Sequence, residues 1–112
     1  MFHHIVLMQW HKGIPEHAVE EISSALDKLH AKTSLLLDYR HGIDLGIGDG
    51  NWDYAVIATF SNKKHYEIFR DDPEHRELIE KFILPWRSKR AAIQIKGKLN
   101  FLAKSSYEND QM

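Results

Sequence analysis

The sequence has no cysteine, only three prolines and no long apolar run. Without cysteine, the chain forms no disulfide, has no thiolate nucleophile and offers no sulfur ligand to zinc. Its apolar runs are far shorter than the ~18 residues of a membrane-spanning helix, and no signal-peptide pattern occurs, so we expect a cytoplasmic protein without a membrane partner. The 15 Lys and Arg residues nearly balance the 16 Asp and Glu residues, which argues against a nucleic-acid partner.

Size and histidine content set further limits. A chain of 112 residues, 43% of them hydrophobic, predicts one domain with a small core and with apolar surface left for association. We assign residues 1–102 to this domain and residues 103–112 to a polar tail. The eight histidines form no metal-binding motif; the adjacent His3 and His4, for example, point to opposite faces of a predicted strand. We therefore expect neither a metal nor another cofactor.

The spacing of apolar residues predicts four strands and two helical regions. The first helix opens at Pro15 and has apolar residues every three or four positions to about residue 31, as in a helix with one buried face. Ser61 or Asn62 caps the second helical region, which breaks before Pro73 because the residue preceding proline avoids helical geometry. The strands are expected at residues 3–10, 35–44, 52–60 and 90–101.

Alternation within the strands assigns side chains to the two faces of the sheet. His4 shares a face with Val6 and Met8, and Tyr54 shares a face with Val56. We assign these residues to the face that the helices cover. In the second strand the alternation is less regular, and it places on one face Leu35, Leu37, Tyr39 and His41.

The element order β-α-β-β-α-β is that of the ferredoxin-like α+β fold, a four-stranded antiparallel sheet with its helices on one face. The other face would be left uncovered, yet it is apolar, because alternation assigns to it Ile5, Leu7, Ala55, Ile57, Ile93 and Ile95. An exposed apolar surface of this kind predicts a homodimer formed through the sheet.

The segment Asp72-Pro73-Glu74-His75 gives the strongest indication of chemistry. Aspartate is a favoured helix cap and proline fits the first helical position, so His75 falls in the first turn of the last helix. The partial positive charge of a helix N-terminus disfavours the imidazolium form, which leaves a neutral base near pH 7. The simpler alternative is a surface histidine on an ordinary helix cap.

Three segments occur in a fixed order over residues 3 to about 96: His4-Ile5-Val6-Leu7, then Trp52-Asp53-Tyr54-Ala55-Val56 ending in Thr59-Phe60, then the step at Asp72-Pro73-Glu74-His75. In these segments the chain resembles the stress-responsive dimeric α/β-barrel (Dabb) family. The resemblance implies that two ferredoxin-like subunits pack their sheets face to face into a barrel. It also implies a pocket between the sheet and the helices.

A further resemblance, to the olivetolic acid cyclase-like members of that family, implies cofactor-free cyclisation of a polyketide acid by an intramolecular aldol step. In that comparison His75 corresponds to the base, and His4 corresponds to a histidine of the pocket. The helical tyrosine of those proteins, six residues before the base, is Phe69 here, and their pocket histidine on the third strand is Tyr54.

Three functions remain open. In the first, the chain is an enzyme acting on a small apolar, aromatic or polyketide-like molecule: His75 removes a proton next to a carbonyl and His4 or Tyr54 holds the oxyanion. The apolar wall of its substrate site would consist of Val6, Met8, Val56, Tyr66 and Phe69. In the second, the chain is a non-catalytic stress-responsive or ligand-binding dimer. In the third, it is a dimeric-barrel monooxygenase in which His75 or His4 would ligate haem.

Overall fold

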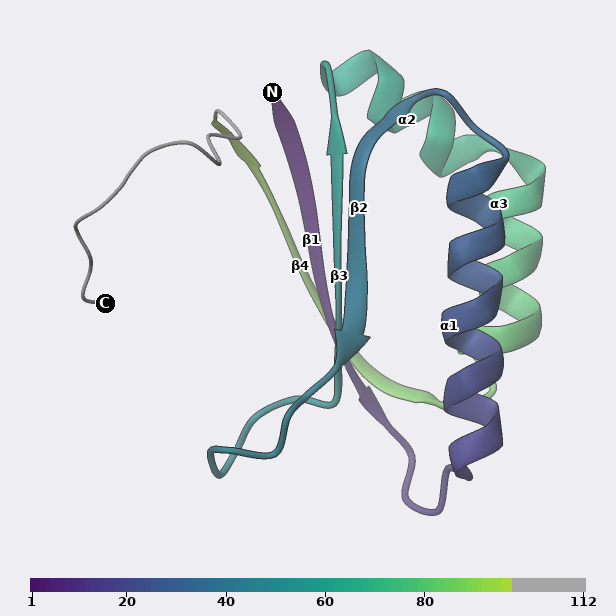
Figure 1. Ribbon diagram of the computed structural model, residues 1–112, viewed down its shortest axis with the longest axis vertical. Helices are drawn as coiled ribbons and strands as arrows, with labels where there is room; N and C mark the ends of the chain where they lie inside the picture. The colour runs from purple at the N-terminus through teal and green to yellow at the C-terminus, as the bar shows by residue number, and fades with distance from the viewer. Residues whose placement is uncertain (98–112) are drawn as a thin grey trace.

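The computed structural model describes residues 1–97, and its elements follow the predicted order (Figure 1). Strands and helices alternate as in the ferredoxin-like fold, which confirms the predicted fold class. The last helical region continues into a turn of π-helix, η1, before the final strand. In chain order the elements are β1 (Phe2–Trp10), α1 (Glu16–Ala31), β2 (Leu36–Ile43), β3 (Tyr54–Phe60), α2 (Lys63–Asp71), α3 (Pro73–Leu78), η1 (Ile79–Ile83) and β4 (Arg87–Lys96).

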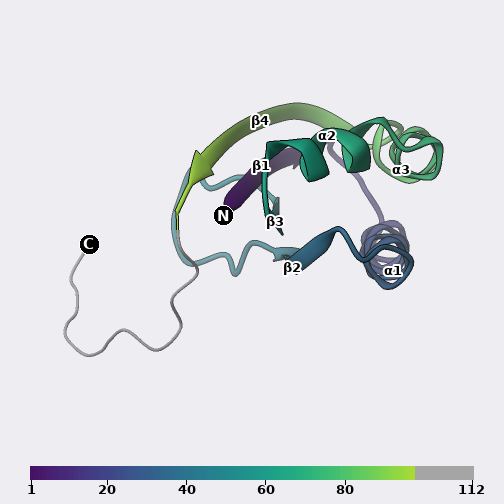
Figure 2. The ribbon, with the colours of Figure 1, turned by 90° about the horizontal axis from the view of Figure 1, so that it is seen from above.

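The four strands form one antiparallel sheet in the order β2-β3-β1-β4. Viewed from above, the helices gather on one side of a curved sheet, and β4 forms one of its edges (Figure 2). In the register of the sheet, His4 lies opposite Ala58 on one side and Gln94 on the other. None of the helices within residues 1–97 is long and apolar enough to cross a membrane.

The core lies between the helices and the covered face of the sheet. Helix α1 buries Ile22 and Leu26 against Val6 and Met8 of β1, as its apolar periodicity predicted. Burying a side chain of this size stabilises the fold by about 2 kcal/mol. A second cluster, nearer the end of β3, packs Phe69 of α2 with Leu29, Leu36, Ala58 and Phe60.

Two strands depart from the predicted pattern. A register shift in β2 between Leu36 and Asp38 adds one residue on that strand, so that Leu36 is buried and Leu37 is exposed. The sequence predicted Leu37 on the same face as Tyr39, and this prediction is wrong. Leu37 is the extra residue of a β-bulge, and a bulge interrupts the regular alternation of side chains along the strand. Strand β4 begins at Arg87, earlier than expected, and its predicted extension to residue 101 lies outside the described residues, as does the polar tail.

The uncovered face of the sheet is apolar, as the alternation predicted. Ile57 lies opposite Ile5 of β1, which in turn lies opposite Ile93 of β4, so the three side chains form a row across the sheet. Within this subunit the exposed fraction is 37% for Ile57 and 57% for Ile93. Leu7 in the adjacent row is 41% exposed. Aliphatic side chains thus lie next to one another in solvent at the centre of the sheet.

Candidate functional site

A cavity of about 180 Å³ lies between the helices and the covered face of the sheet. His4 of β1 and His75 of α3 both line it, although they are far apart in the sequence. The other predicted site residues that line it are Val6, Met8, Val56 and Phe69. The remaining lining residues, which were not predicted as site residues, are Leu26, Tyr39, Ala58, Ile79, Ile83, Arg87 and Arg90.

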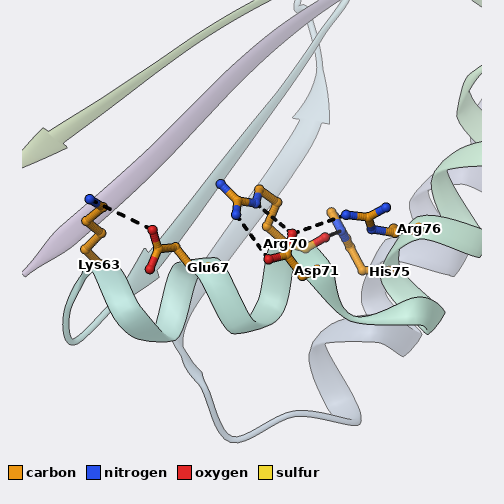
Figure 3. A network of polar contacts seen from close by, with 6 residues as sticks. All are labelled: Lys63, Glu67, Arg70, Asp71, His75 and Arg76. Carbon is orange, nitrogen blue, oxygen red and sulfur yellow. Dashed lines mark hydrogen bonds and ion pairs between the residues drawn. The ribbon is translucent and has the colours of Figure 1, made fainter.

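The sharp corner between α2 and α3 brings His75 to this cavity. The Asp72 carboxylate accepts a hydrogen bond of 2.7 Å from the Glu74 backbone N–H, and Pro73 occupies the first position of α3, as the sequence predicted. The Asp71 carboxylate links the two helices at this corner, because it accepts hydrogen bonds from Arg70 of α2 at 2.9 Å and from Arg76 of α3 at 3.3 Å (Figure 3).

The hydrogen bonding of His75 fixes which of its nitrogens can act as a base. Its Nδ1 lies 3.3 Å from the carbonyl oxygen of Arg70 (Figure 3). Because a carbonyl oxygen can only accept a hydrogen bond, Nδ1 carries the ring proton and is the donor. Nε2 then holds the free electron pair. Burial lowers the pKa of His75, so the neutral imidazole predominates at pH 7. The ring packs on Phe69, with 4.6 Å between centroids.

His4 has the opposite arrangement. The side-chain amide nitrogen of Gln94 donates to Nδ1 of His4 at 2.9 Å, so the proton of the neutral ring resides on Nε2. Burial, together with the positive charge of Arg90, lowers the pKa of His4 to about 4. His4 is therefore a neutral hydrogen-bond donor at pH 7. Both histidines line the cavity, and Nε2 is an acceptor in His75 and a donor in His4.

Two tyrosines predicted for the site are not among the lining residues of this cavity. Tyr54 is buried, but its hydroxyl lies 2.8 Å from Nδ1 of His41 and it does not line the cavity. Tyr66 stacks on Phe2 with 5.0 Å between centroids and contacts His4 in a tilted arrangement at 4.8 Å. The phenol that lines the cavity belongs to Tyr39 on β2.

Sequence reasoning missed the two arginines of β4 as site residues. Arg90 lies opposite Met8 and shares its face, and strand alternation from Gln94 through Ala92 was a signal that could have found it. Arg87 lies beyond a register shift at Gln9 and Trp10, so alternation alone gave no signal for it.

The lining residues offer no metal site. Within residues 1–97, no group of three or more His, Cys, Asp or Glu side chains is placed to hold a metal ion. A haem also fits poorly, because about 180 Å³ is below the ~300–1,000 Å³ usual for sites that hold drug-sized ligands, and a haem is larger than those ligands. The cavity is of a size for a single ring or a short chain.

Comparison with known proteins places the chain among related structures. The family model for the stress-responsive A/B barrel domain (Dabb) matches residues 2–96. A dimeric ferredoxin-like protein from Thermobifida fusca is 34% identical, with a TM-score of 0.78 over 84% of this chain and 88% of that one. No curated protein sequence matches the chain.

Two more distant structures share the fold alone. The hydroxynitrile lyase from Passiflora edulis is 18% identical, with a TM-score of 0.76 over 89% of this chain and 95% of the lyase. An antibiotic biosynthesis monooxygenase is 14% identical, with a TM-score of 0.64 over 88% of this chain and 100% of the monooxygenase. Structures of this fold therefore carry different activities, and the reaction must be argued from the site.

Proposed function

Since the chain belongs to the stress-responsive A/B barrel (Dabb) family, we propose that it is a homodimer whose subunits each bind a small apolar or aromatic molecule between sheet and helices. In this proposal His75 is the general base of a cofactor-free reaction. The apolar row at Ile5, Ile57 and Ile93 supports the dimer, because burying it removes aliphatic surface from water. The Thermobifida fusca relative, itself a dimer, agrees with that assembly.

The observation that carries the catalytic proposal is the opposite hydrogen-bonding character of His75 and His4 on one cavity. A ligand with a C–H bond next to a carbonyl would present the hydrogen to Nε2 of His75 and the oxygen to the Nε2–H of His4. His75 takes the proton, the electron pair of the C–H bond forms the C=C bond of the enolate, and the π pair of the carbonyl moves to its oxygen. The resulting enolate oxygen accepts the hydrogen bond from His4.

The reaction after this step is open to more than one outcome. An intramolecular aldol closure, implied by the resemblance to olivetolic acid cyclase, starts with the same proton removal. Val6, Met8 and Val56 supply an apolar wall that excludes water from the enolate. A non-catalytic binding protein would use the same wall without transferring a proton, so proton transfer is the property to measure.

Phenylacetone in deuterated water tests the proposal, because it has the size of one ring with a short side chain and activated C–H bonds next to its carbonyl. We expect the wild type to accelerate deuterium incorporation at the carbon between ring and carbonyl. His75→Gln should lower the accelerated rate about 10²-fold, the usual loss for a missing general base, with little change in phenylacetone affinity.

His17→Gln is the matched control, because His17 lies exposed on α1 and outside the cavity. It should exchange at the wild-type rate. If His75→Gln also exchanges at the wild-type rate, His75 is not the base. If the wild type binds phenylacetone in the cavity without accelerating exchange, the non-catalytic alternative replaces the enzyme proposal.

A further inference from the structure

The permanent charges on the cavity lining are all positive. Arg87 and Arg90 are the only lining residues that are charged in every physiological state, and neither Asp nor Glu is among the lining residues. The two histidines are neutral at pH 7, because burial lowers the pKa of each. A ligand in this cavity therefore meets two guanidinium groups with no carboxylate of the protein to neutralise them.

The two guanidinium groups also lack partners. Within residues 1–97, the side chains of Arg87 and Arg90 form neither a hydrogen bond nor an ion pair. The arginines outside the cavity differ, because each is paired with an aspartate: Arg40 with Asp38 at 2.9 Å, and Arg70 and Arg76 with Asp71. Burial and the nearby charge of Arg90 lower the pKa of Arg87, so the two cations repel each other at a site that is partly removed from water.

The position of the arginines sets the orientation of a ligand. Arg90 lies opposite Met8 in the register of the edge strand β4, and Arg90 is exposed whereas Met8 is only 2% exposed. The cavity thus runs from a charged, solvent-facing side at β4 to a buried apolar wall. A molecule with one anionic end and one apolar end matches this gradient.

We propose that the ligand is a small carboxylate, with its anionic group bound by Arg87 and Arg90 and its apolar body against Met8 and Val56. A planar guanidinium pairs with a carboxylate through two parallel hydrogen bonds, a geometry that a neutral hydroxyl or carbonyl does not reproduce. The inference rests on the proposed function of the cavity as a binding site and narrows the class of its ligand.

Benzoate and benzyl alcohol are a matched pair of probes, because they share a ring and differ in the anionic group. Titrations followed by NMR of the His4 and His75 imidazole signals report binding inside the cavity. We expect the wild type to bind benzoate about tenfold or more tightly than benzyl alcohol. Arg90→Gln and Arg87→Gln should each remove most of that preference, with a much larger loss of affinity for benzoate than for benzyl alcohol.

Lys89→Gln is the control variant. Lys89 carries the same charge on the same strand, but it lies outside the cavity lining and should retain the preference. Equal affinity for the two probes in the wild type, or an equal loss of preference in Lys89→Gln, would overturn the carboxylate inference while leaving the cavity as a binding site. If neither probe shifts the imidazole signals, the proposed binding function fails and the inference fails with it.

Discussion

The Tyr54 hydroxyl and Nδ1 of His41 share a hydrogen bond of 2.8 Å. The Nε2–H of His41 donates in turn to the Asp27 carboxylate at 2.7 Å. This chain of contacts joins β3 to β2 and then to α1. The chain of contacts engages the hydroxyl that the sequence made a candidate for holding the oxyanion, and it links the helix to the sheet.

Tyr54→Phe should therefore lower stability and leave proton transfer nearly unchanged. The variant keeps the buried ring but removes the hydroxyl that hydrogen-bonds to His41, which costs about 1–2 kcal/mol in the free energy of unfolding. Urea unfolding measures the loss, and the phenylacetone exchange rate should stay within about threefold of the wild type. An exchange rate that falls as far as that of His75→Gln would contradict this prediction and would assign Tyr54 a role in proton transfer.

Tyr39→Phe should show the reverse pattern. Tyr39 lines the cavity, and burial raises the pKa of its phenol, so the group remains a protonated donor at neutral pH. If it supports the enolate together with His4, its loss should lower the exchange rate about tenfold with little effect on phenylacetone affinity. Equal rates for Tyr39→Phe and the wild type would leave His4 as the only donor.

Ile57→Asp should dissociate the proposed dimer. Ile57 lies in the apolar row of the uncovered face, so the variant dimer would have to bury an unpaired carboxylate. We expect the dissociation constant of the dimer to rise at least about thirtyfold. Sedimentation velocity measures the assembly. Ile68→Asp is the matched control, since Ile68 is exposed on helix α2, away from the uncovered face. A wild type that sediments as a monomer at micromolar concentration contradicts the dimer.

Stability should fall in mild acid because of His4. In the unfolded chain this histidine binds a proton near its ordinary pKa of 6.5, but in the folded protein only near about 4. The unfolded state thus holds more protons between these values, so the free energy of unfolding decreases as the pH falls from 6.5 to 4. The shift corresponds to about 3 kcal/mol, which solvent screening at this half-buried site reduces to about 1–2 kcal/mol.

Urea unfolding at several pH values measures this dependence in the wild type and in His4→Gln. The variant should lose less stability than the wild type between pH 6.5 and pH 4, because glutamine does not titrate. His17→Gln, with its exposed histidine replaced, should follow the wild type. An unchanged slope in His4→Gln would show that other groups dominate the acid response.

The sequence by itself determined the elements and much of their orientation, because these depend on contacts between near neighbours in the chain. Regular alternation in β1 placed Val6 and Met8 on the covered face, and cap chemistry at Asp72 and Pro73 placed His75 in the first turn of α3. The apolar character of the uncovered face followed from the same alternation.

Only the tertiary structure decided which polar groups meet in the cavity. The bulge after Leu36 changes the alternation of β2, and the pairing of Tyr54 with His41 depends on contacts between strands and a helix. The tautomer of His4 depends likewise on Gln94, which the register of β4 places beside it. Alternation reports a face only along a regular strand, whereas a bulge and a register between distant segments are set by packing of the whole domain.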